Sequence, residues 1–305
     1  MLVTIGAFDG FHKGHDELLN VCRSNAINNN WGVITFWPHP GVFLKKVNTP
    51  LFNIPERELI AKVLGIPNIF IIEFNDELQN LKPEEFWIMI RNKFNIDGLA
   101  IGKDFRFGIN CSGDANYLSD LAKADGINKI FILDLYEKNV YSSSNARKNI
   151  ISGNVKKVNE ILGYPFFIIS DVITGNQRGS TINFPTANLN ISGLRTIPPA
   201  GVYSAGVLIN NSWYCGAISI GNNPTFGDIK ELRCEVFILN FNGNIYGDEI
   251  AVFFLDKVRD LIKFDDVNKL SVQINKDIKI CEDIYKNEFN RFALSHKFQR
   301  AFTER

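Results

Sequence analysis

The sequence predicts two domains of different class: an α/β domain with a doubly wound parallel sheet, followed by a small antiparallel barrel with a C-terminal helix. At 305 residues the chain exceeds the size at which a single core usually divides. Its first half alternates short apolar runs with helical patterns. After Tyr164, short strand-like runs follow one another closely and are separated by Gly and Pro. We therefore expect domains at 1–163 and 164–305.

Five runs rich in β-branched and aromatic residues predict the buried strands of the first domain. They are 2–5, 33–36, 69–74, 99–102 and 130–135. Pro55 and Gly65 bracket one predicted helix between them, and Pro83 opens another. This alternation is typical of a Rossmann-like sheet covered by helices.

The second domain is predicted from four further runs at close spacing: 202–209, 213–219, 234–239 and 249–255. Asn210-Asn211 and the segment 242–244 lie between such runs, and Asn and Gly tolerate the positive φ that hairpin turns need. Apolar spacing over 265–292 predicts a helix that packs on the barrel.

Charge and cysteine content exclude several classes of partner. Lys plus Arg and Asp plus Glu both number 33, so no long-range field would gather nucleic acid or an anionic membrane. The five cysteines form no CxxC pair and no zinc-type Cys/His spacing, which favours reduced thiols in a cytoplasm. No leader or membrane-spanning pattern is present, and no obligate protein partner is evident. We expect a cytoplasmic protein.

A glycine-rich turn at 6–15 follows the first predicted strand and leads into a helical pattern near Asp16. Backbone N–H groups at such a helix N-terminus can approach phosphate. His12 and His15 can both reach one phosphate and stabilise charge in a transition state. A lone H-x-x-H is more often a turn with surface histidines. Its place after the first strand favours the nucleotide site, and no Walker or dinucleotide fingerprint competes with it.

A second group of polar residues lies in the predicted barrel. Gly175 and Gly179 could form a loop over phosphates, and the following Thr186 and Asn188 supply oxygen ligands suited to Mg²⁺. Glu235 alternates with apolar neighbours, so it points away from the core and could act as a general base at a ligand cavity. Taken singly, Thr-x-Asn is usually turn chemistry and a strand carboxylate is usually just solvated.

Four motifs of the N-terminal half resemble, in order and spacing, the FMN adenylyltransferase module of bacterial FAD synthetases, whose HxGH motif is that of the nucleotidyltransferases. They are TIGAFDGFHKGH at 4–15, TFWPHP at 35–40, GKDFRFG at 102–108 and SSSNAR at 142–147. The resemblance implies attack of the FMN phosphate on the α-phosphorus of ATP, with release of pyrophosphate.

The resemblance also implies roles for single residues. His12 and His15 would be catalytic, and Asp104 would lie by the nucleotide and metal. Ser143, Ser144 and Arg147 would hold phosphates in a mobile loop. The residues implied in ATP binding are Gly6, Phe8, Asp9, Gly10, Asp104, Ser143, Ser144 and Arg147. Without the resemblance, 142–144 would be taken as a flexible loop.

The C-terminal half resembles the riboflavin kinase module. The matching motifs are FPTANL at 184–189, PPAGVY at 198–203, SIGNNPTFG at 219–227, CEVFIL at 234–239, IYGDEI at 245–250 and VRDLIKF at 258–264. The resemblance implies that Thr186 and Asn188 bind Mg²⁺-ATP and that Glu235 activates the terminal ribityl hydroxyl of riboflavin for attack on the γ-phosphorus. It places Arg259 near the flavin.

The chain departs from the family pattern at several positions: Trp37, Cys111 and Ser144 in the first half, and Ser180, Asn183, Phe237 and Leu261 in the second. Trp37 stands at a usually acidic position and cannot bind metal, and Cys111 stands at a usually basic one, which removes one possible phosphate contact. The departures of the second half remove no residue assigned to metal or base. The leading hypothesis is a bifunctional enzyme that uses ATP and Mg²⁺ to convert riboflavin to FMN and FMN to FAD. The alternatives are an FAD synthetase with a degenerate kinase barrel and a non-catalytic flavin-binding protein.

Overall fold

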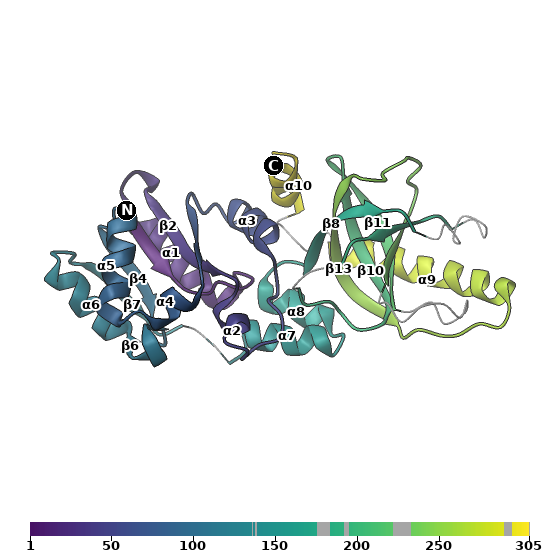
Figure 1. Cartoon of the computed structure of the whole chain (residues 1–305). Helices are drawn as coiled ribbons and strands as arrows, with labels where there is room; N and C mark the ends of the chain where they lie inside the picture. Colours follow the sequence, from purple (N-terminus) through teal and green to yellow (C-terminus); the bar gives the residue numbers. More distant parts are fainter. Residues whose placement is uncertain are drawn as a thin grey trace. The chain divides into compact units, whose positions relative to one another are not determined.

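The computed structural model describes residues 1–135, 137, 139–175, 184–191, 195–221, 233–289 and 295–304. The chain divides into two compact units, Met1–Ser143 and Ser144–Arg305 (Figure 1). The domain boundary expected between residues 163 and 164 remains a prediction.

The first unit is built on a five-stranded parallel sheet in the order β3-β2-β1-β4-β7. The strands are β1 (Leu2–Ile5), β2 (Trp31–Trp37), β3 (Ile69–Glu73), β4 (Gly98–Gly102) and β7 (Lys129–Leu133). Each coincides with a predicted run to within two residues at either end, and the parallel pairing is confirmed. Continuous apolar runs produced this agreement because the central strands are buried on both faces.

Helices connect these strands (Figure 1). They are α1 (Asp16–Asn25), α2 (Pro40–Phe43), α3 (Ile54–Val63), α4 (Asp76–Asn80), α5 (Pro83–Lys93) and α6 (Ala115–Ala124), with a small ribbon of β5 (Arg106–Phe107) and β6 (Gly113–Asp114). Proline stands in the first turn of α3 and of α5, as predicted. Asn53 caps α3 in a capping box with Glu56, which fixes the entry of this helix.

The strand order changes direction at β1. The chain runs from β1 through β2 to β3 on one side and then returns to β4 on the other side of β1. Ligands of open α/β sheets bind beyond the carboxyl ends of the strands at such a switch point. The turn that follows β1 therefore lies where this fold forms its binding crevice.

The second unit contains a closed antiparallel barrel in the order β10-β11-β12-β9-β8-β13. Its strands are β8 (Phe167–Ile173), β9 (Thr186–Leu189), β10 (Gly201–Ile209), β11 (Ser212–Gly221), β12 (Arg233–Ile238) and β13 (Glu249–Arg259). The predicted antiparallel barrel is confirmed. The helices of the unit are α7 (Ser143–Ile151), α8 (Val155–Leu162), α9 (Val267–Glu288) and α10 (Ser295–Thr303). Helix α9 confirms the C-terminal helix and packs on β10, β11 and β13.

One of the two expected hairpin turns is correct. Asn210 and Asn211 have φ of 44° and 65° and join the paired strands β10 and β11. The expectation for residues 242–244 is wrong. This segment connects β12 to β13, but β12 pairs with β11 and β9, whereas β13 pairs with β10 and β8. The turn residues there belong to a longer connection between strands that are not neighbours.

Helix α10 was not predicted, and it covers aromatic side chains of the barrel unit. The Phe298 ring lies 5.7 Å from Tyr164, 5.3 Å from Phe167 and 5.1 Å from Phe253, measured between centroids. Gln299 donates to the backbone oxygen of Asn211 in the β10–β11 turn. The helix is therefore part of the barrel's aromatic core, since offset and edge-on ring contacts add to the burial energy.

Asn159 fixes helix α8 to the barrel. Its buried side chain donates to the backbone oxygens of Phe254 (2.9 Å) and Leu255 (3.2 Å) and accepts from the backbone N–H of Phe166 (2.8 Å). One amide side chain thus satisfies three backbone groups that water cannot reach. Helix α8 and the barrel strands should therefore unfold together.

Replacing Asn159 with Ala should lower the unfolding free energy of the barrel unit by about 2–3 kcal/mol, because buried backbone groups would lose their partners. Hydrogen exchange of peptides from β8 and β13 measures this loss in the second unit alone. Asn154→Ala, which removes only the side-chain cap of α8, is the matched control and should cost about 1 kcal/mol. Equal protection in the two variants would contradict the bridging role of Asn159.

Candidate functional site

The turn after β1 is wound into an uncommon backbone conformation. Phe8, Gly10 and Phe11 have φ of 42°, 97° and 39°, in the left-handed region that non-glycine residues rarely adopt. The Phe8 and Phe11 rings are buried and stacked, with centroids 5.4 Å apart. Burial of these two rings offsets the free-energy cost of the strained backbone. Backbone strain of this kind is typical of functional loops.

The two histidines of the turn lie against each other. The rings of His12 and His15 stack with centroids 3.8 Å apart, and the Phe8 ring lies 4.7 Å from His15. Within the part of the chain that the structure describes, the buried Nδ1 of His15 has no hydrogen-bond partner. Burial, and secondarily the charge of His12, lower the pKa of His15 well below its usual range. The structure thus brings the two predicted catalytic histidines together.

Gly14 is required by a close approach of the chain. A Cβ atom at this position would lie 2.5 Å from the backbone oxygen of Tyr141 and 3.0 Å from Nδ1 of His12. The ammonium of Lys13 lies 5.6 Å from the centroid of the Tyr141 ring. The backbone of Tyr141 therefore packs directly on the HKGH segment, and any side chain at position 14 would separate the two.

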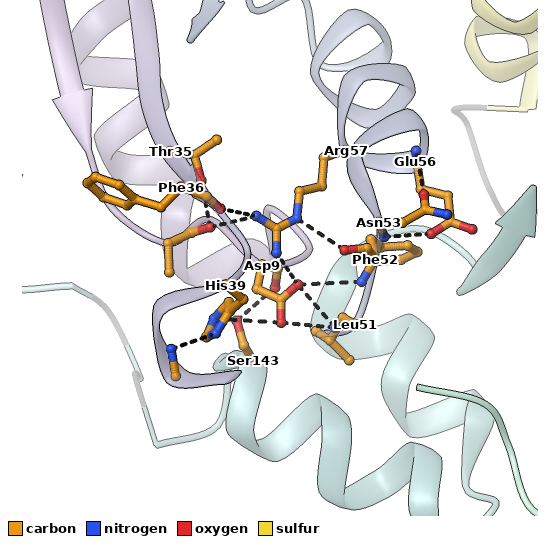
Figure 2. Close-up of polar contacts among 12 residues, drawn as sticks. Asp9, Thr35, Phe36, His39, Leu51, Phe52, Asn53, Glu56, Arg57 and Ser143 are labelled. Atoms are coloured by element: carbon orange, nitrogen blue, oxygen red, sulfur yellow. Dashed lines mark hydrogen bonds and ion pairs between the residues drawn. The ribbon is translucent and has the colours of Figure 1, made fainter. Parts of the chain in front are cut away.

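The carboxylate of Asp9 is buried and held by its own chain (Figure 2). It accepts from the backbone N–H groups of Leu51 (2.9 Å) and Phe52 (3.4 Å) and from Nη2 of Arg57 (3.0 Å). Nε2 of His39 lies 3.9 Å from the second carboxylate oxygen. These contacts fix the turn in place, and the expected contact of Asp9 with ATP remains a prediction.

Arg57 is the site residue that sequence reasoning missed. Its side chain is 1% exposed and comes from α3, a different element from the turn. The guanidinium donates to the backbone oxygens of Phe52 (3.2 Å), Ala7 (3.3 Å) and Phe36 (3.3 Å), besides Asp9. A usable signal was present, because Arg57 lies on the apolar face of a predicted helix, and a charge there needs a buried partner.

Trp37, a departure from the family pattern, lies beside this arginine. The guanidinium carbon of Arg57 is 5.4 Å from the centroid of its ring. The aromatic face thus contributes a cation–π contact to the buried charge. No carboxylate is needed at position 37 for Arg57 to be held, since Asp9 supplies the negative charge.

The remaining predicted residues of this site lie in several places. Gly6 packs closely on the Phe8 ring, since a Cβ atom on Gly6 would lie 3.1 Å from this ring. Gly10 has a positive φ in the turn. Asp104 is exposed just beyond β4, at the same edge of the sheet as the turn. The hydroxyl of Ser143 donates to the backbone oxygen of Asp9 at 2.7 Å. Two further expected phosphate-binding residues, Ser144 and Arg147, belong to the second unit.

In the barrel, three of the predicted residues share one face of adjoining strands. Asn188 pairs with Glu235 across β9 and β12, and the hydroxyl of Thr186 donates to a carboxylate oxygen of Glu235 at 3.3 Å. Cys234 and Val236 are buried in the core, so Glu235 points to the opposite face, as the alternation predicts. The arrangement offers a hydroxyl, an amide and a carboxylate to one ligand.

Gly175 lies against Asn188. A Cβ atom on Gly175 would come within 2.0 Å of Nδ2 of Asn188, so only glycine leaves room for this amide. Gly179, which was expected to cover phosphates, lies outside the described residues, as do Ser180 and Asn183.

These side chains fit a magnesium ion that is bound together with a nucleotide. Mg²⁺ prefers oxygen ligands, keeps several waters and takes only one or two protein ligands when phosphates supply the rest. Thr186 and Asn188 present such oxygens on one face, with the Glu235 carboxylate adjacent. Among the described residues there is no group of three His, Cys, Asp or Glu that could hold a metal by itself.

A cavity of about 390 Å³ adjoins Thr186. One wall is formed by the connection between β12 and β13, the segment wrongly expected to be a hairpin turn. Apolar residues form much of the rest. The lining residues are Val172, Pro185, Thr186, Ala187, Ile238, Phe241, Asn242, Gly243, Asn244, Ile245 and Tyr246. Its volume lies in the range of small-molecule sites.

Arg259 is held by helix α9. Its Nε lies 3.0 Å from Oδ1 of Asp277 and its Nη2 lies 2.6 Å from Oδ2, while Gln273 donates to the same carboxylate. Such a two-point pair is geometrically specific and fixes the end of β13 to the helix. The expected proximity of Arg259 to the flavin remains a prediction.

None of the helices described here is long and apolar enough to cross a membrane.

Comparison with known proteins matches the two parts of the chain to two families. Residues 1–146 match the FAD synthetase family model, and residues 162–285 match the riboflavin kinase model. A bifunctional riboflavin kinase/FMN adenylyltransferase of Listeria monocytogenes is 33% identical over 90% of this chain and 90% of its own length. The protein of the same name from Buchnera aphidicola of Schizaphis graminum is 36% identical over 93% of both chains.

A solved structure shares the fold. The crystal structure of a Streptococcus pneumoniae protein, named there as a macrolide-efflux protein, aligns with a TM-score of 0.81 and 33% identity over 92% of this chain and 93% of its own. Identity above 30% over nine-tenths of the Listeria relative, together with both family matches, decides the assignment. The chain belongs to the bifunctional riboflavin kinase/FMN adenylyltransferase family.

Proposed function

We propose that the chain makes FMN from riboflavin and ATP at the barrel, and FAD from FMN and ATP at the turn after β1. The observation that carries this proposal is the stacked pair of His12, which is buried, and His15, which is partly buried, on a glycine turn at the switch point of the sheet. The hydrogen bond between the side chains of Thr186 and Glu235 supports the proposed kinase site in the barrel. Riboflavin, FMN and ATP are the substrates.

In the adenylyl transfer, a phosphate oxygen of FMN attacks the α-phosphorus of ATP, and the bond to the β-phosphate breaks to release pyrophosphate. No protein nucleophile is needed, so catalysis consists of positioning and charge stabilisation. His12 and His15 donate hydrogen bonds to oxygens that gain negative charge in the transition state. The N-terminus of α1, which begins at Asp16 directly after the motif, adds its dipole.

In the kinase reaction, Glu235 accepts the proton of the terminal ribityl hydroxyl as that oxygen attacks the γ-phosphorus of ATP, and ADP leaves. Thr186 and Asn188 would hold Mg²⁺, which neutralises charge on the transferred phosphate. The hydrogen bond from Thr186 orients the Glu235 carboxylate. The nucleotide would occupy the cavity beside Thr186.

The departures in the kinase half leave this machinery in place among the described residues. The ring of Phe237 packs edge-on against the ring of Phe184, which precedes β9, with centroids 5.5 Å apart. Leu261 lies against Gly221 at the end of β11. Neither replaces a metal ligand or the base, which favours a working kinase over a degenerate barrel. We also propose a cytoplasmic setting, in which the five free cysteines stay reduced.

The two activities should be separable by single substitutions. His15→Ala should lower FAD formation from FMN by at least about 100-fold, because a stabiliser of transition-state charge is lost, and it should leave FMN formation from riboflavin intact. Glu235→Ala should do the reverse, because the barrel loses its base. Chromatography of the flavins after incubation with ATP and Mg²⁺ measures both steps. Loss of the opposite step in either variant would contradict the assignment of the two sites.

Gly175→Ala should impair the kinase through Asn188. The added methyl group would lie 2.0 Å from Nδ2, so the amide must move away from the metal. We expect kcat/KM for riboflavin phosphorylation to fall by about tenfold or more, with a raised KM for Mg²⁺-ATP. FAD formation from added FMN in the same preparation is the control. Unchanged kinase kinetics would rule out the placement of Asn188 on the metal.

The pKa of His15 should rise when ATP binds. In the free protein, burial and His12 hold this pKa well below its usual range, so the ring is neutral at neutral pH. Triphosphate beside the ring favours the imidazolium form and opposes both effects. The chain has four histidines, so NMR titration with a His15→Asn variant for assignment can follow the signal. Adenosine, which has no phosphate, is the control and should leave the pKa of His15 unchanged. An unchanged pKa of His15 at saturating ATP would contradict phosphate binding at this residue.

A further inference from the structure

We infer that Arg57 is a positioning residue for FAD synthesis: through its buried ion pair with Asp9 it fixes the turn that carries His12 and His15 (Figure 2). The inference rests on the proposed adenylyl transfer. It assigns a function to a residue that lies outside all the motifs by which the site was recognised.

The guanidinium of Arg57 joins the segments that form the crevice. Ala7 and Phe36, whose backbone oxygens it binds at 3.3 Å each, lie at or beyond the carboxyl ends of β1 and β2. The third backbone oxygen, that of Phe52, comes from the segment before α3. The hydroxyl of Thr35 donates to the same oxygen of Ala7 at 2.8 Å. One side chain thereby sets the spacing between two strand ends and a helix.

Asp9 transmits this constraint to the histidines. Its carboxylate accepts hydrogen bonds from Arg57 and from the backbone N–H groups of Leu51 and Phe52. Only two residues separate Asp9 from His12, and the intervening turn has left-handed φ at Gly10 and Phe11. A displacement of the Asp9 backbone must therefore move the stacked rings.

The burial of the pair argues against a direct contact between Arg57 and substrate. The side chains of Arg57 and Asp9 are 1% and 0% exposed, and the guanidinium is engaged by four oxygens of the protein. Arg57 accordingly acts through the turn. Its effect on the reaction is one of geometry, and displacement of reacting groups by about 1 Å can cost about 100-fold in rate.

An arginine is needed for this arrangement, since the planar fork of its guanidinium reaches several acceptors at once. Lysine keeps the positive charge but is a single point donor, so it cannot hold Asp9, Ala7 and Phe36 together. Removing the charge altogether leaves the Asp9 carboxylate buried without its cation, which is costly to stability. Arg57→Lys therefore separates positioning from charge, while Arg57→Met removes both.

The test compares both activities of the full-length chain in wild type, Arg57→Lys and Arg57→Met. Rates are scaled to the folded fraction, measured by near-UV circular dichroism of the same samples. We expect Arg57→Lys to lower kcat for FAD formation by about 100-fold while KM for ATP stays within about threefold, because the loss falls on the transition state. Riboflavin phosphorylation in the same chain should be unchanged.

Arg91→Lys is the matched control. Arg91 forms an ion pair with Asp125 at 2.6 Å in the same unit, but both side chains are about one-third exposed and neither contacts the turn. This variant should retain the wild-type kcat for FAD formation. An equal loss in Arg91→Lys and Arg57→Lys would show a general effect of arginine replacement and would overturn the inference.

A double-mutant cycle tests whether the two residues act as a unit. Asp9→Asn should lower kcat for FAD formation, and Asp9→Asn/Arg57→Met should be no slower than Arg57→Met alone, since the pair is already broken. Losses that multiply would overturn the inference, as would a wild-type kcat in folded Arg57→Lys. A wild-type chain that makes no FAD from FMN would overturn the proposed function and the inference with it. If the wild-type chain makes FAD, the results for the variants test the inference about Arg57 alone.

Discussion

The ion pair between Asp9 and Arg57 is the interaction on which the adenylyltransferase half depends. It is fully buried, and it places a charged bridge between the turn after β1, the end of β2 and the segment before α3. Buried ion pairs rarely stabilise a fold better than well-packed apolar side chains do, so their value lies in fixing one arrangement. Here the arrangement is a strained turn that stacks two histidines in a crevice of the sheet.

The barrel solves a related problem by different means. Neighbouring strands present Thr186, Asn188 and Glu235 on one face, with positions set by the register of backbone hydrogen bonds rather than by a buried charge. In both halves a glycine allows the chain to approach the functional side chains closely: Gly14 beside His12, and Gly175 beside Asn188. Rigid strand ends and close backbone contacts are what precise phosphate chemistry requires of a fold.

The sequence predicted those features that depend on local pattern. Apolar runs located all five strands of the parallel sheet, and the motifs located both groups of polar residues. Features that depend on distant partners were missed. Arg57 is identified by Asp9, which lies 48 residues away, and turn chemistry at 242–244 could not reveal that β12 and β13 have other neighbours. Strand β8 was missed although its first four residues are buried in succession like those of β1. Helix α10 was missed because its anchor, Phe298, is recognised only with its ring partners.

We conclude that one chain transfers two different groups of ATP to flavin at two sites, namely the γ-phosphoryl group and the adenylyl group. These two transfers are tested most directly by incubating the purified protein with riboflavin, Mg²⁺ and ATP radiolabelled at either the γ- or the α-phosphorus, followed by chromatography of the flavins. We expect γ-label in both FMN and FAD, and α-label in FAD alone. Flavins without γ-label, or α-label in FMN, would contradict it.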